Sequence, residues 1–163
     1  MSAIFTGSMQ GMAADIIMVM PKYNLFGTQP YSNVEYVRSL EGVEKVTHMT
    51  MLTSDPLDSM FDGMIFAADE NLYDVYPRFQ ATEEHKEAML QRPDGVLVGK
   101  LLADQKGFKI GDKIRTKATF RHEDGTFNWE FEVVGFYTVA QLTGDEMGII
   151  SNYKYIDDSR MTM

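Results

Sequence analysis

The sequence has no cysteine, five prolines and one tryptophan among its 163 residues. The lack of cysteine excludes a disulfide scaffold, thiol catalysis and thiolate metal sites. Basic residues are also scarce: 15 lysines and arginines stand against 24 aspartates and glutamates, which gives a formal net charge of −9. A surface with this charge repels a phosphate backbone, so the composition disfavours nucleic-acid binding.

The sequence also lacks a long hydrophobic run. Its longest uncharged stretch, Met1–Ala14, is broken by polar residues and glycines, whereas a membrane-spanning helix needs about 20 apolar residues. The apolar fraction of 44% and the charged fraction of 24% are nevertheless ordinary for a globular protein. The chain can therefore bury a core, and its length suits one domain or one domain with an embedded lobe.

The N-terminal third predicts a small α/β unit. The apolar run Asp15–Met20 is typical of a buried strand. Ser32 and Glu35 fit a capping box at the start of a helix, and Gly42 stands at the usual stop position. Val43–Leu52 alternates weakly and indicates a second strand.

The middle of the chain predicts short alternating elements. Thr82 can cap a helix over Glu83–Gln91, and the strand Val96–Val98 follows. Lys100–Lys106 is expected to be a helix that ends at Gly107 in a left-handed conformation. A further strand and a further short helix are expected at 64–68 and 70–76.

A β-hairpin is the most sharply defined expectation. Apolar and charged residues alternate on both sides of Asp124-Gly125, a favoured two-residue turn. With these two residues at the tip, apolar side chains face apolar ones and positive charges face negative ones. The pairs in this register are Phe120 with Trp129, Ala118 with Phe131 and Lys117 with Glu132. The second strand is expected to continue over Val134–Val139, and another strand is expected at Ile149–Ile156.

Motifs for catalysis, cofactors and metals are missing or incomplete. Gly95–Lys100 is similar to a phosphate loop, but three residues separate its glycines instead of four, and Leu101 replaces the Ser or Thr that would bind magnesium. The histidines lie far apart in sequence, and the acidic loop lacks the EF-hand spacing. These residues are His48, His85 and His122, and Asp55, Asp58 and Asp62. We therefore expect no catalytic, cofactor-binding or metal-binding residue.

Three aromatic residues, Tyr23, Phe26 and Tyr31, flank the loop after the first expected strand. Exposed aromatic side chains of this kind can contact a partner or a membrane interface. The same residues could instead cover the edge of the core. The sequence leaves both interpretations open.

One longer segment, Gly95–Ile114, carries a family resemblance. In it a strand leads to Gly99, the helix carries Leu102 and Ala103, Gly107 ends the helix, and Gly111-Asp112 turns into a strand. This segment, with three others, resembles the extracytoplasmic domain of MacB/FtsX-type ABC transporter permeases, although Glu41 stands where a proline is more usual. The other segments are Leu40–Val46, Phe131–Tyr137 and Asn152–Arg160, and the match spans roughly residues 13 to 160.

The resemblance implies an α+β fold with two lobes. Residues 13–52 would form the first part of a small α/β membrane-proximal lobe, and residues 53–147 an inserted β-rich lobe with a twisted antiparallel hairpin sheet. Residues 148–163 would be a return strand towards the first lobe, whose remainder would lie outside this chain. The domain would sit between two membrane helices of a permease in the bacterial inner membrane and would face the periplasm or the cell exterior.

The function implied by the resemblance is a non-catalytic relay without a cofactor. ATP-driven motion of the membrane helices would move the domain against a substrate or partner outside, and the expected partners are a cytoplasmic ATPase and a second permease in a homo- or heterodimer. One alternative is a stand-alone extracytoplasmic module with a groove for a peptide or lipid. Another is an enzyme, which would require a deep pocket with perturbed carboxylates.

Overall fold

The chain is described by a computed structural model over residues 16, 17, 19, 30–52, 64–118, 120–140 and 148–161. These residues form five helices and seven strands. The helices are α2 (Ser32–Arg38), α3 (Leu72–Val75), α4 (Glu83–Gln91), α5 (Lys100–Lys106) and α6 (Tyr153–Ser159). The strands are β1 (Met49–Leu52), β2 (Ile65–Ala68), β3 (Phe79–Gln80), β4 (Gly95–Gly99), β5 (Lys113–Lys117), β6 (Asn128–Val139) and β7 (Ile149–Asn152). The prediction of an α+β fold is confirmed.

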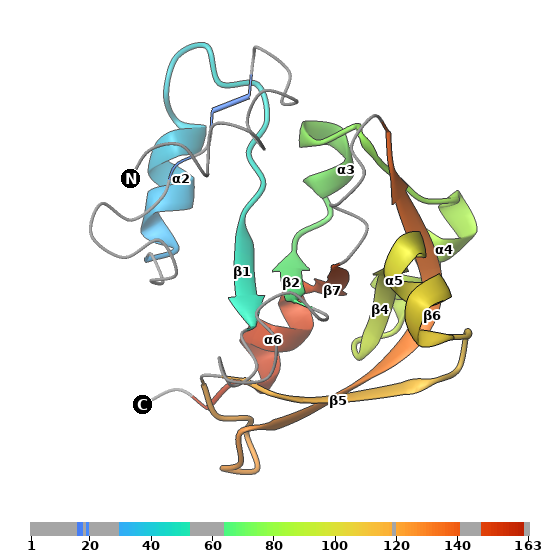
Figure 1. Cartoon of the computed structure of the whole chain (residues 1–163). Helices are drawn as coiled ribbons and strands as arrows, with labels where there is room; N and C mark the ends of the chain where they lie inside the picture. The colour runs from blue at the N-terminus through green and yellow to red at the C-terminus, as the bar shows by residue number, and fades with distance from the viewer. Residues whose placement is uncertain are drawn as a thin grey trace, which may run out of the picture.

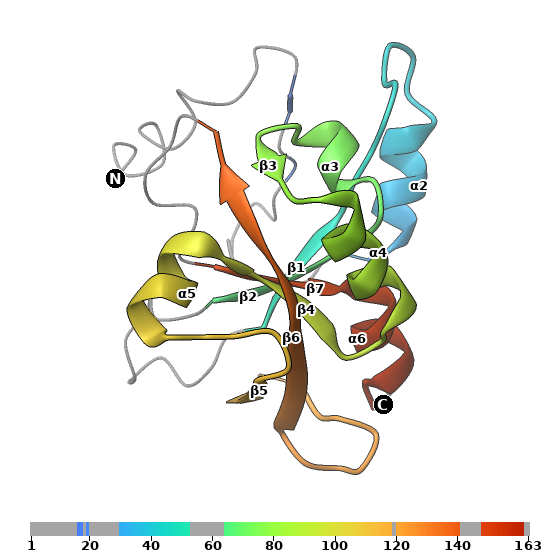
Figure 2. The same ribbon diagram turned by 90° about the vertical axis from the view of Figure 1, so that its right-hand side faces the viewer.

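All seven strands belong to one mixed sheet in the order β1-β2-β7-β4-β6-β3, with β5 also paired to β6. The β2–β7 and β4–β6 pairs are parallel, and the other pairs are antiparallel. β7 thus lies between two strands that precede it by some 50 to 80 residues. Figure 2 shows β6 crossing the middle of the molecule between α5 and α4.

The core consists of two clusters on opposite faces of the sheet, and a β-bulge lets β6 contribute to both. Val133 pairs with Val96 of β4, but Gly135 pairs with Leu97, so Val134 is an extra residue in β6. An extra residue moves the following side chains to the other face of a sheet. Trp129, Phe131 and Val133 accordingly pack with residues of α5 and α6, whereas Tyr137 and Val139 pack with residues of α3 and α4.

Several helix ends agree with the sequence. α4 begins after Thr82, whose side-chain oxygen accepts a hydrogen bond from the backbone N–H of His85 (3.3 Å). α5 ends at Gly107, which has φ 75°. The backbone N–H groups of Gly107 and Phe108 both donate to the carbonyl of Ala103 (2.8 and 3.0 Å), as expected for a helix that ends in a left-handed residue.

We expect Thr82→Ala to lower the free energy of unfolding by about 1 kcal/mol, because it removes the oxygen that caps the first turn of α4. Thr82→Ser keeps this oxygen and should cost only a few tenths of that amount. Urea denaturation of the two variants beside the parent chain measures the difference. Equal midpoints for the alanine and serine variants would contradict the capping role.

The N-terminal third departs from the prediction. Tyr31 is the N-cap residue of α2, without a side-chain capping bond, and Glu35 instead forms an ion pair with Arg38 (2.9 Å). The expected strand over Val43–Leu52 is confined to its last four residues. The sequence also predicts a strand at Asp15–Met20, of which the structure describes residues 16, 17 and 19. These three residues are not in a strand, and Ile17 is 87% exposed.

The hairpin forms with a register different from the predicted one. Lys113 pairs with Glu132, Ile114 with Phe131 and Thr116 with Trp129. This register is shifted by four residues and so keeps every side chain on its expected face. The tip is a three-residue loop with Gly125 at φ 82°, where the N–H of Gly125 donates to His122 O (2.8 Å) and the N–H of His122 donates to Thr126 O (2.8 Å).

The backbone before the tip explains the shift. Met161 N–H donates to Arg121 O (2.9 Å), and Glu123 N–H donates to Ser159 O (2.7 Å). Residues 121–123 therefore pair with the end of α6 instead of β6. This contact between distant parts of the chain leaves no signal in the hairpin's own sequence.

The prediction of one strand over Ile149–Ile156 is half right. β7 ends at Asn152, whose side-chain oxygen accepts a hydrogen bond from Lys154 N–H (2.9 Å) and so caps α6. Residues 153–159 are thus helical, and β7 lies inside the sheet (Figure 1). β1 and β2, which pair with one another, lie on either side of the predicted lobe boundary after residue 52. In the described ranges no helix is long and apolar enough to cross a membrane.

Candidate functional site

The residues of the Gly95–Ile114 motif meet in one strand–helix–turn–strand unit formed by β4, α5 and β5. Gly99 is the N-cap of α5, and its N–H donates to Gly148 O (2.9 Å). Leu102 and Ala103 on α5 are buried in the cluster that contains Phe131. The motif therefore attaches α5 to the sheet from one side.

The turn at the end of this unit is fastened to β6. Gly111 has φ 94°, a conformation that a side chain would disfavour. The carboxylate of Asp112 accepts a hydrogen bond from Lys109 N–H (2.8 Å), and Asp112 O accepts one from Val133 N–H (2.9 Å). The two residues thus set the direction in which β5 leaves the turn.

The predicted hairpin residues Phe120 and Trp129 contact each other despite the shifted register. Their rings meet edge to face with centroids 5.5 Å apart, and Trp129 Nε1 donates to Phe120 O (3.3 Å). Trp129 is 1% exposed and also contacts the ring of Tyr155 at 5.7 Å. Asp124 accepts a hydrogen bond from Thr126 N–H (2.8 Å), which stabilises the loop and holds the pKa of the Asp124 carboxyl below its usual range.

Of the three aromatic residues proposed for partner contact, only Tyr31 lies in the described part of the chain; Tyr23 and Phe26 lie outside it. Tyr31 is 50% exposed, and its ring meets that of His48 at 5.3 Å. One part of the side chain thus packs against His48 and the other faces solvent, and contact with a partner stays a prediction.

A network of ion pairs covers the face of β5 and β6. Arg92 contacts Asp94 (2.7 Å) and Glu132 (2.6 Å), and Lys113 also contacts Glu132 (2.9 Å). The hydrogen bond from Arg92 lowers the pKa of Asp94. This shift is opposite to the one that a general acid requires.

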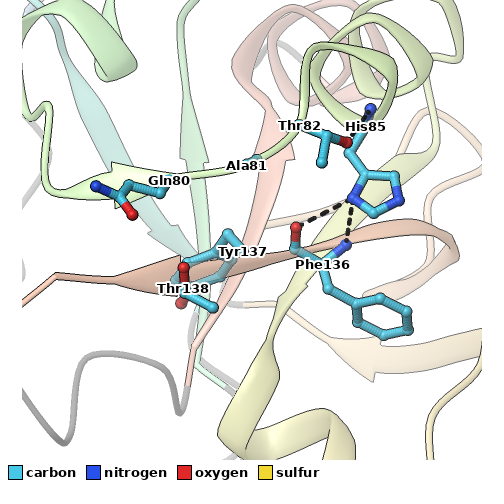
Figure 3. Close-up of a pocket in the computed structure, with 7 residues that line it drawn as sticks. All are labelled: Gln80, Ala81, Thr82, His85, Phe136, Tyr137 and Thr138. Atoms are coloured by element: carbon cyan, nitrogen blue, oxygen red, sulfur yellow. Dashed lines mark hydrogen bonds between the residues drawn. The ribbon is translucent and has the colours of Figure 1, made fainter.

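His85 holds a position that sequence analysis missed. On one edge of β6, β5 pairs with Asn128–Glu132 and β3 with Thr138 and Val139, which leaves Phe136 between them. His85 Nδ1 lies 3.3 Å from both the N and the O of Phe136 (Figure 3). On this edge of β6, the His85 imidazole therefore contacts the backbone N and O of Phe136, the groups that a neighbouring strand would otherwise contact.

Gly135 makes this arrangement possible. A Cβ atom at this position would lie 2.4 Å from Cγ of His85, far inside van der Waals contact. An isolated glycine within a strand pattern is a signal for a bulge or a close approach, and it could have identified this contact. An open depression of about 320 Å³ lies beside it (Figure 3), lined by Gln80, Ala81, Thr82, His85, Phe136, Tyr137 and Thr138.

The histidines do not gather into a site. His48 lies beside Asp69, His85 beside Phe136, and His122 beside Asp124. Among the residues that the structure describes, no group of three or more His, Cys, Asp or Glu side chains could hold a metal ion. The acidic loop with Asp55, Asp58 and Asp62 lies outside those residues.

No protein-family model matches the chain, and no curated protein matches it. Among solved structures, the chain is similar to the crystal structure of the periplasmic region of MacB from Actinobacillus actinomycetemcomitans. The sequence identity is 13% and the TM-score is 0.42. The alignment covers 80% of this chain and 60% of the MacB chain, so this chain spans less than two thirds of that region.

Proposed function

We propose that the chain is an extracytoplasmic domain of a MacB/FtsX-type ABC transporter permease and relays ATP-driven motion of membrane helices to a substrate or partner outside the inner membrane. The observation that supports this proposal is the packing of the family-like segments. Three of the four segments meet there: Leu102 from Gly95–Ile114, Phe131 from Phe131–Tyr137 and Ile156 from Asn152–Arg160 are buried in the same cluster. These segments thus form one body, which a relay requires.

The proposal includes the division of the chain and its partners. Residues 13–52 would form the first part of the membrane-proximal lobe, residues 53–147 the inserted lobe, and residues 148–163 the return to the first lobe. Tyr31 is a proposed contact for a partner because half of its surface is exposed. A second permease and a cytoplasmic ATPase would complete the assembly.

Cysteine labelling in intact cells tests whether the domain lies outside the inner membrane. Because the sequence contains no cysteine, only the introduced residue can react. We expect Glu87→Cys, at an exposed position of α4, to react with a membrane-impermeant maleimide before lysis. Ser151→Cys, which is fully buried in β7, is the matched control and should react only after denaturation. Labelling of Glu87→Cys only after lysis would contradict the proposal.

Two further readouts separate the relay from the alternative of a stand-alone module. The relay requires the labelled protein to remain with the membrane fraction after a salt wash, whereas release into the soluble fraction would favour the stand-alone module. In the membrane-embedded protein, spin labels on Glu87→Cys of two copies should change their separation when an ATP analogue binds. An unchanged distance distribution would contradict the relay.

A further inference from the structure

His48 and Asp69 face each other directly beyond the end of a strand pair. Met49 and Ala68 form the terminal pair of the antiparallel β1–β2 ladder, so His48 and Asp69 are the next residues in register. His48 Nδ1 lies 2.9 Å from Oδ2 of Asp69, and the two side chains are 16% and 17% exposed. The pair is thus largely withdrawn from solvent.

Other side chains extend this contact along the segment that leads from α2 to β1. Thr47 Oγ1 donates to Asp69 Oδ1 (2.6 Å), and Asn71 Nδ2 donates to Val46 O (3.2 Å). An ion pair between Lys45 and Asp74 (2.5 Å) lies next to them. We call residues 45–48 together with residues 69–74 the clasp.

α2 is linked to the clasp at its N-terminal end. No residue of α2 is buried, and Tyr36 is 65% exposed. Figure 1 shows the helix beside β1 at the margin of the molecule. Tyr31, the N-cap residue of α2, contacts the ring of His48 and thereby links the helix directly to the clasp.

The His48 ring lies between two tyrosines. The centroids of the Tyr31 and Tyr153 rings are 5.3 and 4.0 Å from that of His48, both edge to face. In the described part of the chain, neither nitrogen of His48 has a well-aligned hydrogen bond, although both are buried. The close charge contact with Asp69 is therefore the principal polar interaction of the ring.

The charged and titratable groups around His48 come from three elements. Asp69 follows β2, Tyr31 precedes α2, and Tyr153 begins α6, where Asp157 and Arg160 act on Tyr153 with opposite sign. Burial raises the pKa of Asp69, but the neighbouring His48 and the hydrogen bonds from Thr47 Oγ1 and Asn71 N–H together lower it by more, so the net pKa lies below its ordinary value. Asp69 is therefore ionised throughout the range in which an imidazole titrates.

We propose that His48 is a protonation-controlled latch: as an imidazolium paired with Asp69 between two tyrosine rings, it holds the clasp and α2 against the sheet more firmly than it does as a neutral imidazole. The charged form gains the full attraction of the carboxylate. The state that binds the proton more tightly gains population as the pH falls. The test therefore compares pH values on either side of about 6.5, the ordinary value for histidine side chains in general. The latch does not depend on the proposed function.

Hydrogen exchange of the 163-residue chain tests the latch. After correction for intrinsic exchange rates, we expect amides of Val43–Leu52 to be about 3–10-fold more protected at pH 5.5 than at pH 7.5, the effect of a partly buried charge pair. His48→Gln and Asp69→Asn should each abolish this difference. Asp69→Asn retains the oxygen that Thr47 contacts, so it removes the charge and keeps most of the shape.

His122→Gln is the matched control. His122 also lies near a carboxylate, with Nδ1 3.7 Å from Oδ1 of Asp124, but it is outside the clasp. This variant should keep the full pH response. Equal or weaker protection at pH 5.5 in the parent chain, or a pH response that survives in His48→Gln, would overturn the latch. If both clasp variants fail to fold, an NMR titration of the parent chain decides: Val43–Leu52 amides that do not follow the titration curve of His48 also overturn it.

Discussion

Replacing Trp129 by alanine is expected to lower the free energy of unfolding by about 3–5 kcal/mol, the usual cost of removing a large buried aromatic side chain. Trp129 is 1% exposed and contacts Phe120, Phe131 and Tyr155. It also donates the hydrogen bond to Phe120 O that fixes the backbone before the hairpin tip. Because Trp129 is the sole tryptophan of the chain, the denaturation has to be followed by circular dichroism instead of fluorescence.

Phe127→Ala is the matched control for Trp129→Ala. Phe127 precedes β6 by one residue, is 43% exposed and contacts Arg121 across its ring. We expect its removal to cost under about 1 kcal/mol, since a surface contact contributes little. Comparable losses for the two variants would show that the aromatic cluster around Trp129 does not stabilise the hairpin in the way described.

Gly135→Ala is expected to have the second largest effect, a loss of about 2–3 kcal/mol. The new Cβ would overlap the His85 ring, whose Cγ lies 2.4 Å from that position, and would separate the imidazole from Phe136. Urea denaturation measures the loss. Gly148→Ala is the control, because its nearest neighbour, Tyr137 Oη, lies 3.1 Å from the added atom and needs to move only slightly.

A double-mutant cycle shows whether His85 causes the penalty. In a His85→Ala background the same glycine substitution should cost less than about 1 kcal/mol, because the overlapping ring is gone. The coupling energy between the two sites should therefore exceed about 1 kcal/mol. Additive effects would mean that the bulge at Val134, and not the imidazole, requires the glycine.

Local signals predicted the elements whose ends are set by neighbouring residues. Thr82 and Gly107 define α4 and α5 correctly, because a cap acts within one turn of a helix. Ser32 failed as a cap since the helix begins one residue earlier, after Tyr31. Asn152 is the cap that the sequence analysis overlooked, and it divides the expected C-terminal strand into β7 and α6.

Non-local contacts account for the features that the sequence could not supply. The alternation of apolar and charged residues disfavours a one-residue slip of the hairpin, because such a slip would move every side chain to the other face of the sheet. It does not distinguish registers that differ by four residues, because an even shift keeps each side chain on its face. The pairing of residues 121–123 with residues 159–161 decides between them. The contact of His85 with Phe136 likewise joins residues 51 positions apart. Gly135 was the one sequence signal that pointed to it.

The two backbone hydrogen bonds between the hairpin tip and the end of α6 also determine how the domain responds to tension. A pull on the chain beyond Met161 acts first on the bond from Met161 N–H to Arg121 O and on the bond from Glu123 N–H to Ser159 O. We expect both to resist the unwinding of the last turn of α6. Force applied there is thus expected to pass into the hairpin and along the twelve residues of β6, the longest strand among the described residues, so β6 is mechanically in series with α6.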